Sequence, residues 1–184
     1  MPKKEIYIVI SRTGSVVSSI IKEFTHAEYN HVSVSLDPAL NVMYSFGRWN
    51  AYFPWIGGFV EESPHFGTLK RFPETEVIVL AIPIKDDTYN NIQKRLAEML
   101  AEKYSYPYDM IGLLFAAINI IYHRKNHFYC SEFVRSLLVA YKIASEDVFP
   151  PIIRPMDFLD MPNSREIYRG KLIDFPTVKA EVSA

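Results

Sequence analysis

Segments with the periodicity of strands and segments with the periodicity of helices follow one another along this chain without a regular alternation. Strict alternation is typical of a doubly wound parallel sheet, so the irregular order favours an α+β fold with a small antiparallel sheet packed against helices. The predicted strands are residues 6–11, 31–36, 42–46, 76–84 and 166–174, and the predicted helices are residues 15–24, 86–103, 110–122 and 130–141. The length of 184 residues predicts one domain over 1–184, with an ordered core from about residue 5 to about residue 175.

The second and third predicted strands form a hairpin, because the five residues between them are rich in turn formers. Symmetrical pairing about this loop places Leu36 opposite Val42 and Ser33 opposite Ser45. In that register His31 lies diagonal to Ser45 on one face of the sheet. The strand at residues 76–84 carries Pro83, which predicts a position at the edge of the sheet.

Residues 47–67 read as a long irregular loop that is rich in aromatic side chains. Loops of this length are typically functional, and we expect this one to cover a cleft, with Gly57 and Gly58 as its hinge. Its aromatic side chains predict an apolar pocket wall, and its two carboxylates either meet an amino group of a substrate or are solvated. The candidate substrate-binding residues are Trp49, Tyr52, Trp55, Glu61 and Glu62.

Charge and cysteine content narrow the classes of partner and cofactor. The formal net charge of −1 gives no whole-protein field that recruits nucleic acid. The chain has one cysteine, Cys130, which cannot form an internal disulfide, and a structural zinc site usually needs several thiolates. We therefore expect no metal and no cofactor.

The apolar stretch at residues 110–122 is too short to span a bilayer, and the first residues lack the features of a secretory signal. A cytoplasmic location without a transmembrane segment is the expectation that follows. The stretch itself predicts a buried helix, and the alternative is a helix that touches a membrane or a lipid substrate.

Cys130 opens a predicted helix, where the helix dipole favours the thiolate form that attacks carbonyl groups. The alternative is an inert buried thiol. A reactive thiol needs a base, and His31 begins a strand whose polar face carries only small side chains besides the imidazole. His127 is a second candidate because it lies close to Cys130 in the sequence, whereas the other histidines lie in predicted loops.

Three segments, at residues 29–35, 43–47 and 128–134, together resemble the permuted branch of the NlpC-type papain-like hydrolases, which includes the YiiX-like proteins. In that branch the histidine strand precedes the cysteine helix, which reverses the order found in papain. The stretches at residues 106–109 and 155–157 are similar to the same branch. The resemblance implies a circularly permuted papain-like fold and the chemistry of a cysteine peptidase.

The resemblance also implies roles for individual residues. Cys130 corresponds to the nucleophile, His31 to the base and Ser45 to the third position, where relatives usually carry Glu, His, Asn or Gln. A serine hydroxyl has no charge and stabilises an imidazolium less than a carboxylate does. The backbone N–H of Cys130 and the hydroxyl of Tyr7 or Tyr29 are the candidate donors to an oxyanion.

These features predict a cysteine hydrolase or acyltransferase that acts on an amide, ester or thioester bond. Its expected partner is a small molecule, a peptide fragment or a lipid-like amide. The alternative, which the serine at the third position favours, is a catalytically weak or inactive protein that binds a small molecule or peptide on the same fold.

Overall fold

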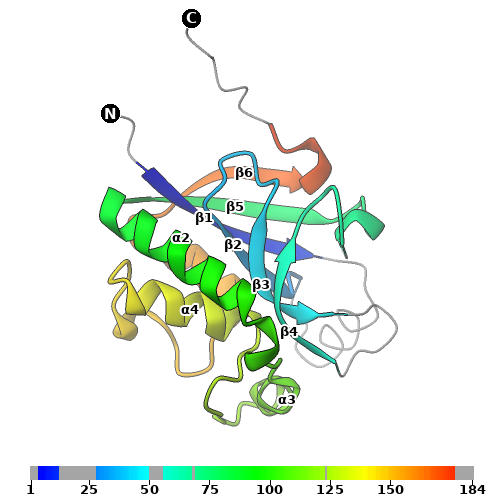
Figure 1. The fold of residues 1–184 in the computed structure, drawn as a ribbon, viewed down its shortest axis with the longest axis vertical. Helices are drawn as coiled ribbons and strands as arrows, with labels where there is room; N and C mark the ends of the chain where they lie inside the picture. Colours follow the sequence, from blue (N-terminus) through cyan, green and yellow to red (C-terminus); the bar gives the residue numbers. More distant parts are fainter. Residues whose placement is uncertain (1–3, 13–27, 50–55, 68, 123, 177–184) are drawn as a thin grey trace, which may run out of the picture.

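The computed structural model describes residues 4–12, 28–49, 56–67, 69–122 and 124–176, and in these residues the chain is an α+β protein built on a six-stranded antiparallel sheet (Figure 1). The strand order is β4-β3-β2-β1-β5-β6. The strands are β1 (Lys4–Arg12), β2 (His31–Ser35), β3 (Met43–Arg48), β4 (Gly57–Glu62), β5 (Glu76–Ile84) and β6 (Arg165–Lys171). The strands predicted at residues 6–11, 31–36, 42–46 and 76–84 are confirmed, and the one predicted at 166–174 is confirmed as far as Lys171, after which residues 172–174 form a 3-10 turn. The helix predicted at residues 15–24 lies outside the described residues.

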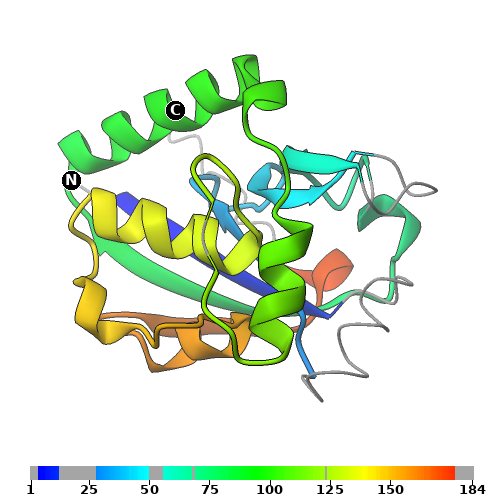
Figure 2. The same ribbon diagram turned by 90° about the horizontal axis from the view of Figure 1, so that it is seen from below.

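Two long helices, α2 (Asp86–Ala101) and α4 (Cys130–Ala140), cover one face of the sheet (Figures 1 and 2). A shorter helix, α3 (Met110–Ala117), follows α2 in the chain. Five 3-10 turns complete the described elements: η1 (Leu69–Arg71), η2 (Lys103–Ser105), η3 (Glu146–Val148), η4 (Pro155–Asp160) and η5 (Leu172–Asp174). None of the described helices combines the length and the apolar character that crossing a membrane requires.

The central strand β1 is apolar from Ile6 to Ile10 because both of its faces are buried there. Ile6, Ile8 and Ile10 face the layer of α2 and α4, whereas Tyr7 and Val9 belong to a second apolar cluster on the opposite face. A strand buried on both sides loses the apolar–polar alternation that an exposed face would impose. The position of β1 in the middle of the sheet thus explains its sequence.

Strand β4 lies within the segment that was predicted to be an irregular loop, and that prediction is wrong for residues 57–62. The strand pairs with β3 from Met43 opposite Glu62 to Arg48 opposite Gly57. Gly58 is not a hinge, because a Cβ atom there would lie 2.4 Å from the backbone oxygen of Tyr106. The glycine is needed because residues 106–108 approach β4 closely at this point: the N–H of Phe59 donates to the backbone oxygen of Tyr106, and the N–H of Tyr108 donates to that of Gly57.

The prediction that β5 lies at the edge of the sheet is also wrong, because β5 pairs with β1 on one side and β6 on the other. Pro83 is tolerated because the pairing with β6 ends at Ala81, so the missing N–H removes no bond from that ladder. The helix predicted to be buried at residues 110–122 ends at Ala117 as α3, and several of its apolar side chains are exposed.

Candidate active site

Cys130 is the first residue of α4 and therefore lies at the N-terminal end of the helix. The preceding residue, Tyr129, is extended, and its N–H donates to the carboxylate of Glu132 at 3.5 Å. Helix α4 packs against β2 and β3. The thiol is 5% exposed and lines a pocket, at the end of the helix where the dipole favours an anion.

Strands β2 and β3 separate at the end of β2 that carries His31. The predicted hairpin register is confirmed by Val34, which lies opposite Tyr44, and within the described residues this is the one position at which the two strands pair. The backbone of Val32 is therefore available to the site. Its carbonyl accepts a hydrogen bond of 2.7 Å from the Ser45 hydroxyl, and its backbone is one of the groups that lower the pKa of the Cys130 thiol.

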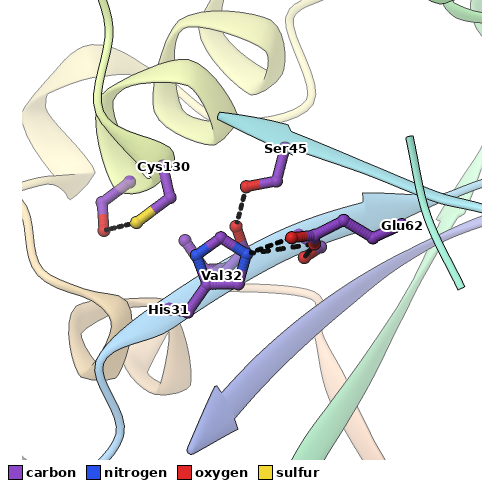
Figure 3. Close-up of polar contacts among 7 residues, drawn as sticks. His31, Val32, Ser45, Glu62 and Cys130 are labelled. Atoms are coloured by element: carbon purple, nitrogen blue, oxygen red, sulfur yellow. Dashed lines mark hydrogen bonds and ion pairs between the residues drawn. The ribbon is translucent and has the colours of Figure 1, made fainter. Parts of the chain in front are cut away.

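This geometry corrects the role predicted for Ser45. Its hydroxyl proton is directed at the carbonyl of Val32 and not at the imidazole (Figure 3). Ser45 does share a sheet face with Ser33, as the register requires, but it satisfies a backbone carbonyl that the separated strands leave unpaired. The third position of the site belongs to another residue.

That residue is Glu62, on β4. Its two carboxylate oxygens each lie 3.0 Å from Nε2 of His31, and the hydroxyl of Ser33 donates to one of them at 2.5 Å. Figure 3 shows the imidazole between Glu62 on one side and Cys130 on the other. The side chains of His31 and Glu62 are only 17% and 10% exposed, so water screens their interaction weakly.

Glu62 reaches His31 although strand β3 lies between their strands. The residue that permits this is Gly47 of β3: a Cβ atom there would lie 3.7 Å from Oε1 of Glu62 and 3.3 Å from a methyl carbon of Val60. A side chain longer than alanine would occupy the space of the carboxylate. The absence of a side chain at Gly47 thus leaves space for Glu62 of β4 to reach His31 of β2.

The electrostatics of the three groups are mutually supporting. Burial by itself would raise the pKa of the Cys130 thiol, but the hydrogen bond and charge of His31 outweigh it, and the pKa is lowered. Burial would lower the pKa of His31, but the charge of Glu62 and the hydrogen bonds to Cys130 and Glu62 hold it well above its ordinary value. The pKa of Glu62 is lowered despite its burial by the charge and hydrogen bond of His31. These directions favour a thiolate–imidazolium pair beside an ionised carboxylate.

A pocket of about 620 Å³ opens beside the thiol and the imidazole. Of the predicted substrate-binding residues, Trp49, Glu61 and Glu62 line it, whereas Tyr52 and Trp55 lie outside the described residues. Glu62 is committed to His31, so its predicted role as a partner for a substrate amino group is wrong. The other lining side chains are mostly apolar or cationic and include Phe46, Phe59, Leu69, Leu100, Met110, Leu113, Arg48 and Lys103.

The tyrosines predicted to face an oxyanion lie elsewhere. The hydroxyl of Tyr7 donates to Glu5, and Tyr29 is one of the groups that raise the pKa of Arg169 on the edge strand β6. Neither residue lines the pocket. Both tyrosine assignments are therefore wrong, because neither hydroxyl faces the pocket that contains Cys130.

Tyr108 lines the pocket in their place. Its N–H donates to the backbone oxygen of Gly57 at 2.9 Å, and the next residue, Asp109, donates to the backbone oxygen of Phe128 at 2.9 Å. The segment thereby joins β4 to the start of α4. Burial and the negative charge of Cys130 raise the pKa of Tyr108 well above its ordinary value, so its hydroxyl stays protonated near the sulfur and can donate.

The sequence contained a signal for the positions of Tyr108 and Glu62 in the site, although not for their roles. Tyr108 lies in the segment at residues 106–109, which resembles the same papain-like branch. Glu62 ends a run in which apolar and polar residues follow a pair of glycines, which is a short strand pattern within the supposed loop. His127, the second candidate for the base, does not line the pocket. Its ring nitrogen Nδ1 lies 2.8 Å from the backbone oxygen of Lys125.

Among the described residues, no three His, Cys, Asp or Glu side chains gather in a way that could hold a metal ion. Comparison with known proteins gives no independent assignment: no protein-family model matches the chain, and no curated protein matches it. The chemistry of the site must therefore be argued from its geometry.

Proposed function

We propose that this protein is a cysteine hydrolase or acyltransferase on a circularly permuted papain-like fold, as the resemblance implies, with Cys130, His31 and Glu62 as its reacting and orienting groups. The observation that carries the proposal is the pairing of His31 Nε2 with both oxygens of a buried carboxylate at 3.0 Å, next to a thiol at a helix N-terminus. A nucleophile, a base and a third group that orients the base form the arrangement of covalent acyl-transfer catalysis.

The first half of the reaction begins with the thiolate of Cys130 and the imidazolium of His31. The sulfur attacks the carbonyl carbon of the substrate, and the carbonyl electron pair becomes an oxyanion. The backbone N–H of Cys130, in the unpaired first turn of α4, and the hydroxyl of Tyr108 donate to that oxyanion. When the oxyanion collapses, the bond to the leaving group breaks, the leaving group takes the proton of His31, and a thioester on Cys130 remains.

The second half regenerates the thiolate. Water in a hydrolase, or an alcohol or amine in an acyltransferase, gives its proton to His31 and attacks the thioester carbonyl. The carbon–sulfur bond then breaks and the acyl product leaves. The apolar lining of the pocket, with Trp49 and Phe59, suits an acyl or aromatic group, and Arg48 and Lys103 suit an anionic one.

The substrate class within this proposal is a peptide fragment or a lipid-like amide or ester. A cytoplasmic setting, which is part of the proposal, would bring such small substrates to the pocket. The alternative of an inactive binding protein rested on Ser45 as an uncharged third residue. Glu62 supplies the carboxylate that this argument took to be missing, so we retain the enzyme as the proposed function.

The test is acylation of Cys130 by p-nitrophenyl esters of short and long acyl chains. We expect release of p-nitrophenolate together with a mass increase of one acyl group, both lost in Cys130→Ala and strongly reduced in His31→Ala. Ser136→Ala, an exposed serine on the same helix, is the control and should behave as the parent does. Parent protein that is folded yet neither releases p-nitrophenolate nor gains the acyl group would contradict the proposal.

A further inference from the structure

Of the eleven large apolar side chains that are exposed in the described residues, six lie on α3 and the segment that follows it. Six side chains contribute, each between 37% and 59% exposed: Ile111, Leu114, Ile118, Ile120, Ile121 and Tyr122. We refer to these six residues as the α3 patch. Figure 1 shows α3 at the bottom of the molecule, outside the layer that α2 and α4 form over the sheet.

The two parts of the α3 patch are fixed against each other. Asn119 adopts a left-handed conformation with φ of 62°, which turns the chain back at the end of α3. The N–H of Ile120 then donates to the backbone oxygen of Phe115 at 2.9 Å, and the rings of Phe115 and Tyr122 lie 5.0 Å apart. The patch is therefore a built surface. Exposed aliphatic clusters of this kind mark interaction sites. Burying these side chains against a partner would be favourable, because it removes their apolar surface from water.

Two exposed cations accompany the patch, whereas the carboxylate that lines a groove with Ile120 and Ile121, that of Glu132, is buried. From Met110 to Ser131 the chain contains no Asp or Glu, and it contains Arg124 and Lys125. Arg124 pairs with the buried Asp109 at 2.9 Å, whereas Lys125 is exposed. Arg154 is exposed too, and it donates to the side-chain oxygen of Asn119 at 2.7 Å, at the turn within the patch. The N–H of Arg154 also donates to the carboxylate of Asp157 at 2.7 Å. Lys125 and Arg154, which we refer to as the cationic rim, together with an apolar centre complement a surface that is anionic outside and apolar beneath.

The same helix also forms a wall of the pocket. Met110 and Leu113 of α3 line the pocket that contains Cys130, while Leu114 and Ile118 belong to the patch. A surface bound to the patch would thus lie next to the pocket. A second copy of the chain fits less well, because a twofold contact through the patch would bring the two cationic rims together.

We propose that the α3 patch docks the protein onto an anionic lipid surface, with the apolar side chains entering the acyl region and Lys125 and Arg154 at the headgroups. The docking does not depend on thiol chemistry, so its failure and the failure of the proposed acyl-transfer function are distinguishable. Its consequence for that function is that lipid-like substrates reach the pocket from the bilayer.

The experiment is co-sedimentation of the full chain with vesicles of phosphatidylcholine alone and with vesicles in which about a third of the lipid is phosphatidylglycerol. We expect binding to the anionic vesicles that weakens as salt is raised. The double variant Leu114→Ser/Ile118→Ser should lose affinity by about tenfold or more, and Lys125→Glu by several-fold. Ile173→Ser removes an equally exposed aliphatic side chain from η5, and it should bind as the parent does, as should Cys130→Ala.

A cooperative thermal unfolding transition establishes that each variant is folded. We expect the serine variants and Lys125→Glu to fold, because the replaced side chains are exposed. Binding that is absent from both vesicle types, or that is equal in the parent and the folded double variant, overturns the proposal. Concentration-dependent dimerisation of the parent that the double variant abolishes, without vesicle binding, overturns it as well and assigns the patch to a second copy.

Discussion

Two parts of the sheet use their backbone in opposite ways. Strands β1 and β5 pair without interruption from Lys4 opposite Ile84 to Arg12 opposite Glu76. Strands β2 and β3 pair at Val34 and Tyr44 and then separate, and the backbone of Val32 serves Cys130 and Ser45. In β1 and β5 the backbone groups are used in the hydrogen bonds between the two strands, and we refer to this pair as the frame. Where β2 and β3 stop pairing, their backbone groups are free to interact with the side chains of the site.

The side chains differ in the same sense. The residues of β1 and β5 that face the helices are aliphatic and buried, whereas the neighbouring strands β2, β3 and β4 bury Ser33, Ser45 and Glu62. Each of these three polar groups has a partner. Changes in the frame should therefore alter stability, and changes in the separated part should alter the reactivity of the thiol.

The largest expected effect is that of His31→Ala on the alkylation of Cys130 by iodoacetamide near neutral pH. We expect a fall in rate of about a hundredfold, because the thiolate loses the cation that favours it. The matched change in the frame is Val79→Ala, which should lower the free energy of unfolding by about 2 kcal/mol while leaving the alkylation rate of the folded protein unchanged. Equal rates for parent and His31→Ala would abolish the distinction between the two parts.

Glu62→Gln should shift the pH profile of alkylation. The carboxylate charge raises the pKa of His31, and the charged His31 in turn lowers the pKa of Cys130. Without that charge the imidazolium is lost at lower pH and the thiol ionises at higher pH, so the rise of the alkylation rate moves upward in pH and the rate near pH 6 falls several-fold. Glu61→Gln, one position away on β4, should leave the profile in place. A profile that Glu62→Gln does not move would exclude the carboxylate as the orienting group.

Ser45→Ala tests the assignment of this serine to the backbone. The substitution leaves the carbonyl of Val32 buried without its partner, which should cost about 1–2 kcal/mol of unfolding free energy, measured by urea denaturation. The alkylation rate should change less than twofold. Ser136→Ala is the control, because Ser136 also donates to a backbone carbonyl, at 2.8 Å, but is exposed so that water can replace it. If Ser45→Ala were as stable as the parent but its Cys130 were alkylated more slowly, Ser45 would be the residue that orients His31.

The smallest effect concerns stability against pH. The pKa of Glu62 is lowered, so its contribution is present above the ordinary value of 4.5 and is lost as pH falls through the folded value. The pKa of His31 is raised, so its contribution is present below the ordinary value of 6.5 and is lost as pH rises through the folded value. The difference in unfolding free energy between the parent and Glu62→Gln should therefore be largest between these two values and decline outside them, by about 1 kcal/mol. A difference that is flat with pH would contradict the ion pair.

The sequence by itself determined the local features of this protein. The aliphatic run of β1, the register of the β2–β3 hairpin and the start of a helix at Cys130 follow from side-chain periodicity and turn chemistry, which act between residues close in the chain. The same patterns singled out His31, because a lone imidazole among small polar side chains stands out on a strand.

The tertiary structure decided which distant groups meet. Glu62 became the partner of His31 through the pairing of β4 with β3 and the space left at Gly47, and Tyr108 reached the pocket through backbone bonds to Gly57 and to the segment before α4. The outward face of α3 was decided in the same way, since an apolar helix is buried only when another element covers it. Such contacts depend on the order of strands and the packing of layers, and the periodicity of a single segment contains no information about either.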